Sequence, residues 1–305
     1  STGEILTNLK LKEAMRKAHL RELGEQRKKR FLRSEDERAK KMGVQFIPAD
    51  QLSDEQKKMA LKCRFSYTRK RPTLEQEKDN EEGDAKARLV AMDLKKRNKK
   101  PATSTYAPTP SLGAVRLLVA STDTETQELS TDDFVTAFLQ SREFKDGKLV
   151  LICFFDIFLG KTVYEWIVGV MYGMQEASAD WKDTLCYALT VEMDFQELKN
   201  MQSVYRQPTR GTIVMCHVDD PLARHNSKED MIWFHSALKE KFDMNGYKHL
   251  QVGLAIDYCS MRLQITEAKN LTIDNEAKIN KYLQEMGMLG CNSVKEPIRA
   301  DTLKN

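Results

Sequence analysis

Short segments in which apolar and polar residues alternate predict a half-buried sheet in this chain. Residues 63–71 and 86–94 both alternate in this way. The acidic segment between them, 74–85, has a composition that buries little surface and predicts a mobile loop. The two alternating segments are therefore expected to form a hairpin. Further strands are expected at 212–220, from Leu250 to Ile256, and at 261–265.

Helical periodicity fills much of the remaining sequence. Leu9, Met15, Leu20 and Leu23 fall near a 3.6-residue spacing and predict a helix over residues 7–42, with Lys, Arg and Glu in the gaps. The mixture of separated strands and helices predicts an α+β fold with a largely antiparallel sheet. Further helices are expected at 112–121, at about 175–198, after Ser227, and from about 274 to Gly287.

Charge is divided unevenly along the 305 residues, although the net charge is only +4. Residues 1–104 hold 28 Lys and Arg against 17 Asp and Glu, whereas the remainder holds 21 against 28. A basic region is an electrostatic footprint for phosphate backbones, but solvated helix faces give similar counts. The tract from Glu25 to Lys41 is therefore interpreted as a basic arm on nucleic acid, a helix docked on a partner, or a solvated helix.

Two absences in the sequence predict a soluble, intracellular protein with no membrane partner. The longest apolar run, Leu149 to Phe155, is far shorter than the roughly 20 residues that span a bilayer, and the N-terminus lacks a signal-peptide core. The six cysteines are scattered without a C-x-x-C pair, as expected for reduced thiols, and do not distinguish nucleus, cytoplasm or organelle. They are Cys63, Cys153, Cys186, Cys216, Cys259 and Cys291.

Adjacent carboxylates at Asp219 and Asp220 end the apolar strand predicted at 212–220. Burial makes two neighbouring negative charges costly unless a cation neutralises them. Mg²⁺ prefers carboxylate oxygens, and a two-metal site needs several carboxylates converging on ions about 4 Å apart. An Asp-Asp pair at a strand end is also compatible with a solvated turn.

A series of motifs gives these aspartates a context. They are KARLVA at 86–91, TYAP at 105–108, AVRLL at 114–118, ELSTDDFVTAFL at 128–139, MYGMQEASADW at 171–181, CHVDD at 216–220 and KFDMNGYKHLQVGLAIDY at 241–258. In this order and spacing, the chain beyond about residue 61 resembles the copia-type reverse transcriptase of LTR retrotransposons. The family's catalytic strand, E-L-x-Q-M-D-V-K-T-A-F-L, aligns its carboxylate with Asp133 and not with Asp132.

The resemblance implies a right-hand polymerase with a fingers hairpin and a palm whose antiparallel sheet is flanked by helices. It implies RNA-directed DNA synthesis, in which deoxynucleotides are added to a primer on an RNA or DNA template with Mg²⁺ (or Mn²⁺). The expected divisions are a basic helical N-terminal extension at 1–60, fingers at 61–115, a palm with the catalytic aspartates at 116–270, and a C-terminal helix and tail at 271–305.

Roles for individual aspartates follow from the same resemblance. Asp133, Asp219 and Asp220 would ligate two metal ions. One ion would lower the pKa of the primer hydroxyl, and both would steady the phosphorus centre and the departing pyrophosphate.

Five other residues would bind the nucleotide. Phe138 stands where the family carries an aromatic steric gate against the ribose 2′-hydroxyl, or it is a core side chain. Lys86 and Arg88 would grip the triphosphate, or they belong to a surface hairpin. Tyr172 would approach the nascent base pair with Gly173, whose missing side chain would permit close contact, or Tyr172 is structural.

Departures from the family pattern bear on activity. His217 replaces the usual Tyr or Phe and places a titratable ring near the metals. Glu176 and Asp180 replace a neutral amide and a cation, which should weaken nucleic-acid binding. Residues 151–157 replace a proline-containing loop, so the path between the central motifs is open. The alternative to an active polymerase is therefore a domesticated, catalytically weak or inactive subunit with a structural or RNA-binding role, joined to a protein or ribonucleoprotein assembly through the basic N-terminal helix.

Overall fold

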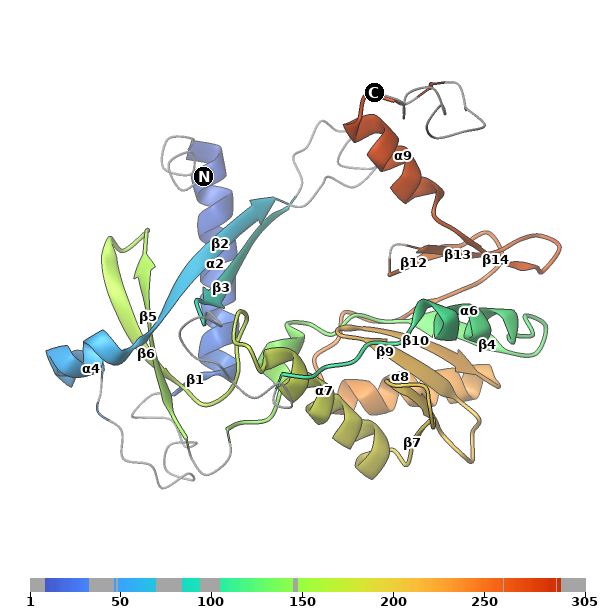
Figure 1. The fold of residues 1–305 in the computed structure, drawn as a ribbon, viewed down its shortest axis with the longest axis horizontal. Coiled ribbons are helices and arrows are strands. Elements are labelled where there is room, and N and C mark those ends of the chain that lie inside the picture. The colour runs from blue at the N-terminus through green and yellow to red at the C-terminus, as the bar shows by residue number, and fades with distance from the viewer. Residues whose placement is uncertain are drawn as a thin grey trace, which may run out of the picture.

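The computed structural model describes residues 9–32, 47, 49–69, 84–93, 105–144, 148–259, 261–288 and 290–291. Within these ranges the chain is a mixed helix and sheet structure with a five-stranded, a six-stranded and a three-stranded sheet (Figure 1). The loop predicted at 74–85 lies outside the described residues as far as Gly83.

The five-stranded sheet contains the predicted hairpin strands. They pair antiparallel from Cys63↔Ala91 to Arg69↔Ala85. The apolar run near Leu149 also forms a strand of this sheet, and it pairs parallel with the first hairpin strand. The strand order is β1 (Phe31–Leu32), β6 (Lys161–Ile167), β5 (Val150–Asp156), β2 (Leu61–Arg69) and β3 (Ala85–Ala91).

The six-stranded sheet is antiparallel throughout. Its order is β11 (Lys248–His249), β4 (Glu128–Thr131), β10 (Asp220–His225), β9 (Ile213–His217), β8 (Val204–Arg206) and β7 (Gln196–Glu197). Along β9, Val214 and Cys216 pack into one apolar cluster and Met215 into another, because successive side chains point to opposite faces. Burial on both faces explains why this strand is almost continuously apolar.

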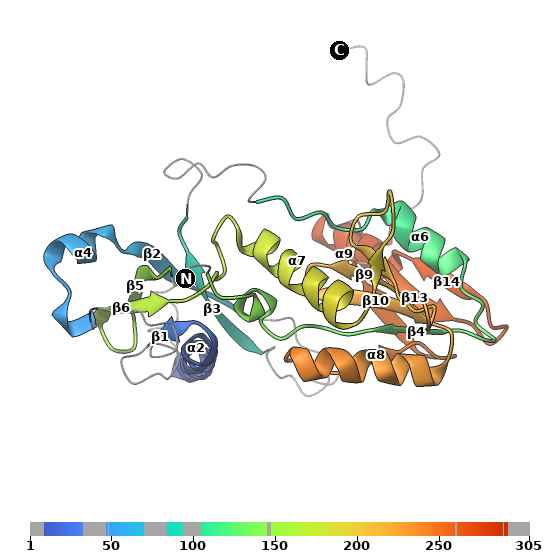
Figure 2. The ribbon, with the colours of Figure 1, turned by 90° about the horizontal axis from the view of Figure 1, so that it is seen from below.

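Different elements cover the two faces of the six-stranded sheet. Helices α7 (Ala177–Tyr187) and α8 (Lys228–Lys241) supply side chains to the cluster on one face. Helix α6 (Leu112–Ala120) and the three-stranded sheet supply the other (Figures 1 and 2). The three-stranded sheet has the order β12 (Ala255–Tyr258), β13 (Met261–Ile265) and β14 (Leu271–Asp274).

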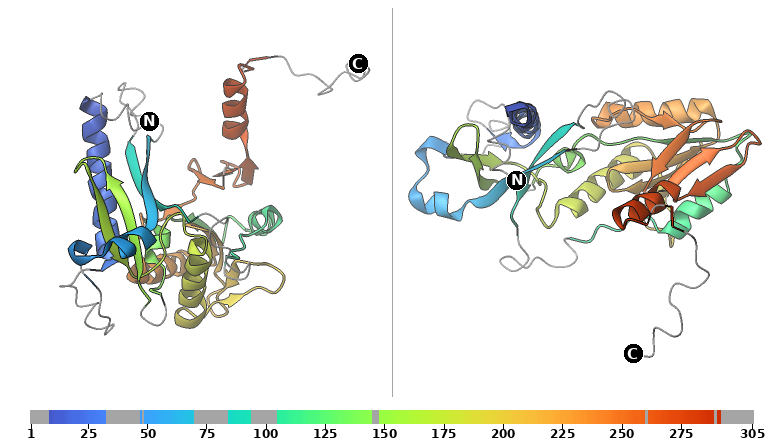
Figure 3. Two further views of the ribbon diagram at one scale, coloured as in Figure 1. Left: turned by 60° about the vertical axis from the view of Figure 1, so that its left-hand side comes forward. Right: turned by 90° about the horizontal axis from the view of Figure 1, so that it is seen from above.

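Apart from α2, two further helices lie outside these layers, together with three short helical turns. Helix α9 (Glu276–Glu285) projects from the three-stranded sheet, whereas helix α4 (Asp54–Met59) precedes β2 (Figure 3). Gly287 follows α9 with a φ of 67°, as predicted for a helix end. The turns are 3₁₀ helices η1 (Ala49–Gln51) and η3 (Ala137–Gln140), and η5 (Ala188–Glu192), a π-helical continuation of α7.

Helix α2 (Leu9–Lys29) packs against β3 of the five-stranded sheet (Figure 3). Its buried face includes His19, Glu22 and Gln26, whereas Leu20, expected on the apolar face, is 55% exposed. The polar groups are buried because they find partners. His19 lies 2.8 Å from the Tyr67 hydroxyl and 3.1 Å from the Asp156 carboxylate.

Several predicted boundaries were wrong. The helix expected over 7–42 ends at Lys29, because the next residues form strand β1 against β6. For residues 25–32 the solvated-helix interpretation is also wrong, since Gln26, Arg30 and Phe31 are buried. The helix expected to reach 198 ends at Glu192.

The strand predicted from Leu250 to Ile256 was also wrong at its start. Strand β12 begins only at Ala255, and Val252 and Leu254 are exposed. The helices predicted at 112–121 and after Ser227 are confirmed, with Ser111 and Ser227 as their N-caps. None of the helices in the described ranges combines the length and apolar character that crossing a membrane requires.

We expect His19→Ala to lower the free energy of unfolding by about 2 to 4 kcal/mol, because it removes a buried side chain and leaves Tyr67 and Asp156 without their shared partner. Urea denaturation would measure the loss. Lys17→Ala, on the same helix with a side chain that is 74% exposed, should change stability by less than about 0.5 kcal/mol. Equal effects of the two substitutions would contradict a buried role for this face of α2.

Candidate active site

A two-residue turn, Val218-Asp219, joins β9 to β10, with His217 opposite Asp220 in the register. Val218 has a φ of 60°, whereas Asp219 has no positive φ, as in a type II′ turn. Glycine normally occupies this first position. A β-branched residue there stores on the order of 1–3 kcal/mol of strain. The adjacent carboxylates thus stand on a tight, strained turn.

Trp181, on helix α7, supports this turn. Its indole N–H donates a hydrogen bond of 2.7 Å to the Val218 carbonyl. The ring is 1% exposed and packs edge-to-face against Phe134 and Phe242, at centroid distances of 5.0 and 5.4 Å. This aromatic group fixes the position of the hairpin end. Sequence reasoning assigned no role to these rings, since aromatic residues in a core look alike in sequence.

Strand pairing brings Asp133 to the same place. β4 pairs with β10, and the chain beyond β4 continues along the hairpin. The Phe134 amide donates to the Asp219 carbonyl at 3.1 Å. Asp133 is exposed, and its carboxylate accepts a hydrogen bond from the Asn245 side-chain amide. Three carboxylates from two distant segments are thereby gathered at one end of the six-stranded sheet.

The gathered carboxylates perturb one another. Burial, followed by the charges of Asp219 and Asp133, raises the pKa of Asp220 to about 6. Burial also raises the pKa of Asp133, with Asp219 acting in the same direction and the Asn245 hydrogen bond opposing it. A cation would relieve this repulsion. In the part of the chain that the structure describes, however, no three His, Cys, Asp or Glu side chains form a group arranged to hold a metal ion.

Strand β3 brings its cations to these carboxylates. The charge of Lys86 partly offsets the effects that raise the pKa of Asp133. The Arg88 guanidinium lies 5.1 Å from the centroid of the Tyr172 ring, and Phe138 packs edge-to-face on the same ring at 5.4 Å. The nearby charge of Asp219 contributes to raising the pKa of Tyr172 to about 12, although burial is the main cause. The predicted nucleotide-binding side chains therefore lie together beside the aspartates.

Gly173 makes its close contact with β3. Its φ is 87°, and a Cβ atom at this position would lie 2.2 Å from the Ala91 carbonyl oxygen and 2.6 Å from Val90. The Ala91 amide donates to the Tyr172 carbonyl at 2.6 Å. The absence of a side chain is thus needed for packing against the protein's own backbone. The close approach of Gly173 to a nascent base pair stays a prediction.

Asp132 is buried directly beside exposed Asp133. One of its carboxylate oxygens accepts the backbone N–H groups of Asp133 at 2.8 Å and Gly246 at 3.1 Å. The other oxygen lies 3.3 Å from Nδ1 of His235 on α8. Asp132 therefore ties the backbone of Asp133 to the backbone of Gly246. Asp133 is the member of the pair that faces the hairpin.

A buried polar chain continues from His235 through the sheet. The Ser130 hydroxyl lies 2.8 Å from Nε2 of both His235 and His225, and Thr212 lies 3.4 Å from the other His225 nitrogen. Burial lowers the pKa of His225 to about 3, so this ring is neutral at pH 7. In one consistent orientation Thr212 donates to His225, His225 to Ser130, and Ser130 to His235. Nδ1 of His235 then carries its proton and lies 3.3 Å from the Asp132 carboxylate, without meeting the geometry of a hydrogen bond. Sequence reasoning missed this chain because its members are far apart in sequence.

The two acidic residues that depart from the family pattern lie at the start of α7. Glu176 is the N-cap position, and Asp180 falls within the first turn. Negative charge near a helix N-terminus is favourable, since the unpaired backbone N–H groups carry partial positive charge. These acids therefore have a structural reason to be present. His217, half-buried opposite Asp220, lowers the pKa of that carboxyl, against the larger effects that raise it.

We expect Asp220→Asn to stabilise the chain at pH 8 in buffer containing a chelator. The pKa of Asp220 is about 6 in the folded protein and about 3.9 in an unfolded chain. The folded state therefore loses stability as the pH rises from about 4 through 6. The gain should be about 1 to 2 kcal/mol at pH 8, because solvent screens part of the repulsion, and should vanish near pH 4.

Urea denaturation at the two pH values would measure this gain. Asp183→Asn, which neutralises a carboxylate whose side chain is 75% exposed, is the matched control and should show no such pH dependence. A gain for Asp220→Asn that is the same at pH 4 and pH 8 would show that the repulsion is absent.

Comparison with solved structures finds telomerases. The telomerase from Candida albicans in complex with a TWJ fragment of telomeric RNA matches at 10% identity and a TM-score of 0.40, over 83% of this chain and 52% of that one. The apo telomerase from Candida tropicalis truncated from its C-terminal domain matches at 7% identity and a TM-score of 0.40, over 76% and 56%. The chain thus spans about half the length of these structures.

Comparison at the level of sequence is more informative. A search of curated proteins gives no match. A family model described as reverse transcriptase (RNA-dependent DNA polymerase) matches residues 51–300. This range contains the three aspartates, both cations of β3 and the aromatic pair Phe138 and Tyr172. The chain belongs to the reverse transcriptase (RNA-dependent DNA polymerase) family.

Proposed function

We propose that this chain is the RNA-directed DNA polymerase domain of a copia-type retroelement, or of a host gene derived from one. The observation that carries the proposal is the meeting of Asp133 with the Asp219-Asp220 hairpin, next to β3 and Phe138, within the range that matches the family. In polymerase terms, the β2–β3 hairpin is the fingers and the six-stranded sheet is the palm. The partners would be an RNA or DNA template with its primer, and deoxynucleoside triphosphates.

The three aspartates would hold Mg²⁺ or Mn²⁺. Their oxygens are the ligands that these hard cations prefer, and the raised pKa values of Asp220 and Asp133 indicate that a further positive charge would be favourable there. The Asp133 carboxylate would have to turn from the Asn245 amide towards the hairpin. When bound, the ions would lower the pKa of the primer 3′-hydroxyl and offset charge on the transferred phosphorus and the departing pyrophosphate.

The other residues would orient the nucleotide. Lys86 and Arg88 project from the strand beside the carboxylates, where cations can bind the triphosphate oxygens. Phe138 and Tyr172 present two rings in edge-to-face contact, and the Phe138 ring would collide with a ribose 2′-hydroxyl. Asp132 would keep the backbone of Asp133 in place, so that its carboxylate need not reorganise during the reaction.

We expect the native chain to extend a DNA primer on an RNA template with Mg²⁺, and Asp219→Asn plus Asp220→Asn to reduce incorporation at least about a thousandfold, because metal coordination at the transferred phosphate is lost. The control is Asp183→Asn plus Asp257→Asn, which removes the same charge from side chains that are 75% and 73% exposed. This control should remain active. Equal, background-level incorporation by the native chain and the site variant would sink the polymerase proposal.

Thermal unfolding tests metal binding at the three aspartates without depending on turnover. Mg²⁺ or Mn²⁺ should raise the midpoint of the native chain and of the surface control, because an ion that binds only the folded state stabilises it. The shift should vanish in the site variant. A shift of the same size in all three proteins would place the ion elsewhere.

One observation favours a second function, that of a catalytically silent subunit in a larger assembly. In the described arrangement the aspartates do not form a metal-holding group, and an amide already engages Asp133. A domesticated reverse transcriptase with a structural or RNA-binding role would keep this fold. Stoichiometric co-purification with a large complex, together with background incorporation, would favour this function over the polymerase.

A further inference from the structure

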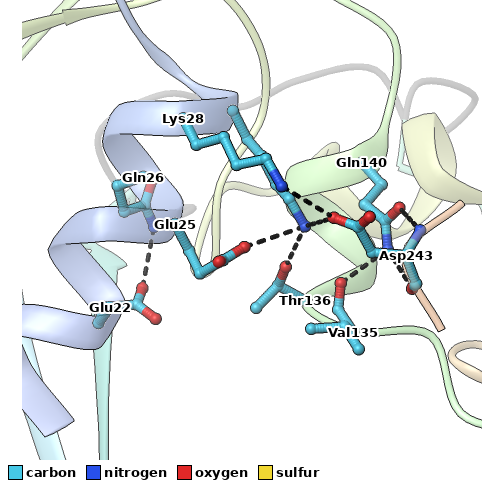
Figure 4. Close-up of polar contacts among 9 residues, drawn as sticks. Glu22, Glu25, Gln26, Lys28, Val135, Thr136, Gln140 and Asp243 are labelled. Atoms are coloured by element: carbon cyan, nitrogen blue, oxygen red, sulfur yellow. Dashed lines mark hydrogen bonds and ion pairs between the residues drawn. The ribbon is translucent and has the colours of Figure 1, made fainter. Parts of the chain in front are cut away.

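The end of helix α2 lies against the turn that carries Phe138. The helix precedes residues 51–300, which match the family, yet its last residues reach the six-stranded half of the molecule (Figure 4). The turn of η3, residues 136–141, and the segment 243–246 meet there. The side chains of Lys29 and Arg30 contact the first of these, and Lys29 contacts both.

Lys29 joins the three parts through its ammonium group. The nitrogen lies 3.1 Å from the Glu25 carboxylate on its own helix, 2.9 Å from the Asp243 carboxylate, and 3.0 Å from the Thr136 hydroxyl. Figure 4 labels these three partners. An ammonium has three donors, and here each one finds an acceptor. The Lys29 side chain is only 10% exposed. Partial burial makes this contact stronger than an exposed ion pair.

Arg30 fixes the other end of the same turn. Its Nη2 donates to the carbonyl oxygens of Phe138 and Ser141, both at 2.9 Å. The residue is 2% exposed. Gly169 leaves room for it, because a Cβ atom there would lie 2.5 Å from a guanidinium nitrogen. The carbonyl of Phe138, the proposed gate residue, therefore accepts a hydrogen bond from the residue that directly follows α2.

The turn itself needs such support. Thr136 adopts a left-handed conformation, with φ 53° and ψ 48°, which is costly for a β-branched residue. The Thr136 side chain is held by Lys29, and its carbonyl accepts the Leu139 amide at 2.8 Å. The position of Phe138 thus depends on a strained residue held from outside the turn.

The contacts extend to Asp133. The Asp243 backbone exchanges hydrogen bonds with the Gln140 side chain in both directions, and its carbonyl accepts the Val135 amide at 2.9 Å. Two residues further on, the Asn245 amide donates to the Asp133 carbonyl at 3.0 Å. A displacement of Asp243 would therefore move the backbone before Phe138, at Val135, and the side chain after it, at Gln140.

We propose that the C-terminal turn of α2, acting through Lys29 and Arg30, positions the Phe138 turn and thereby sets the selection of deoxyribonucleotides over ribonucleotides. This inference rests on the proposed polymerase function. Lys29 and Arg30 are positioning residues, since neither is placed against the nucleotide. A helix that only stabilised the fold would leave the ratio of the two nucleotide activities unchanged.

The first test is the ratio of kcat/KM for a deoxynucleotide to kcat/KM for the matching ribonucleotide, measured with the full chain on one primer and template. Lys29→Met keeps the side-chain length and removes the charge. We expect the ratio to fall about tenfold, and Lys29→Arg to restore most of it. Lys28→Met is the matched control. Its nitrogen lies 3.8 Å from the same Asp243 carboxylate, but its side chain is 69% exposed, so the ratio should not change.

The second test is hydrogen exchange, which needs no activity. In Lys29→Met, the amides of Val135, Leu139 and Asn245 should exchange at least about tenfold faster than in Lys28→Met. Unchanged exchange overturns the positioning claim. Faster exchange with an unchanged nucleotide ratio overturns the claim about selection. A native chain that incorporates neither nucleotide overturns the proposed function and selection with it, and exchange then still decides whether α2 positions the turn.

Discussion

Repulsion between like charges is the constraint on which the site depends. Asp133 and Asp220 lie in segments far apart in sequence, and no attraction between their side chains would bring them together. Backbone hydrogen bonds between β4, β10 and β9 do so, helped by the Trp181 bond to the turn. Burial, and after it the charges of Asp219 and Asp133, raises the pKa of Asp220, so the sheet holds these carboxylates together at an energetic cost. A sheet buried on both faces is rigid enough to hold such a cluster.

A second principle is that the polar groups around the site find their partners in linked series of hydrogen bonds and ion pairs, and not in isolated pairs. Asp132 is tied through His235 and Ser130 to the interior of the sheet, and Lys29 is tied through Asp243 to Gln140. Within each series, removing one member leaves another buried or strained group without its partner. The position of Asp133 thus depends on buried residues that lie behind it in the sheet and on α8.

Local patterns in the sequence predicted local structure well. Alternation identified β2 and β3, and capping residues located α6 and α8. The predicted site residues were brought together because ordered motifs carry information about topology. Alternation failed near Val252, where exposed apolar residues imitate a strand. Periodicity also failed at Leu20, because the buried face of α2 is partly polar, and only tertiary partners such as Tyr67 and Leu89 make that burial favourable.

Burial of β9 on both faces has a consequence for synthesis of the chain. Until β8 and β10 pair with its edges and α6, α7 and α8 cover its faces, the segment from Ile213 to Cys216 is an uncharged, apolar strand with two β-branched residues. Such segments pair readily with copies of themselves. The acidic pair that follows after His217 and Val218, Asp219 and Asp220, puts charge beyond its end. The carboxylates that we assign to chemistry would then also act as gatekeepers against aggregation while the protein is being made.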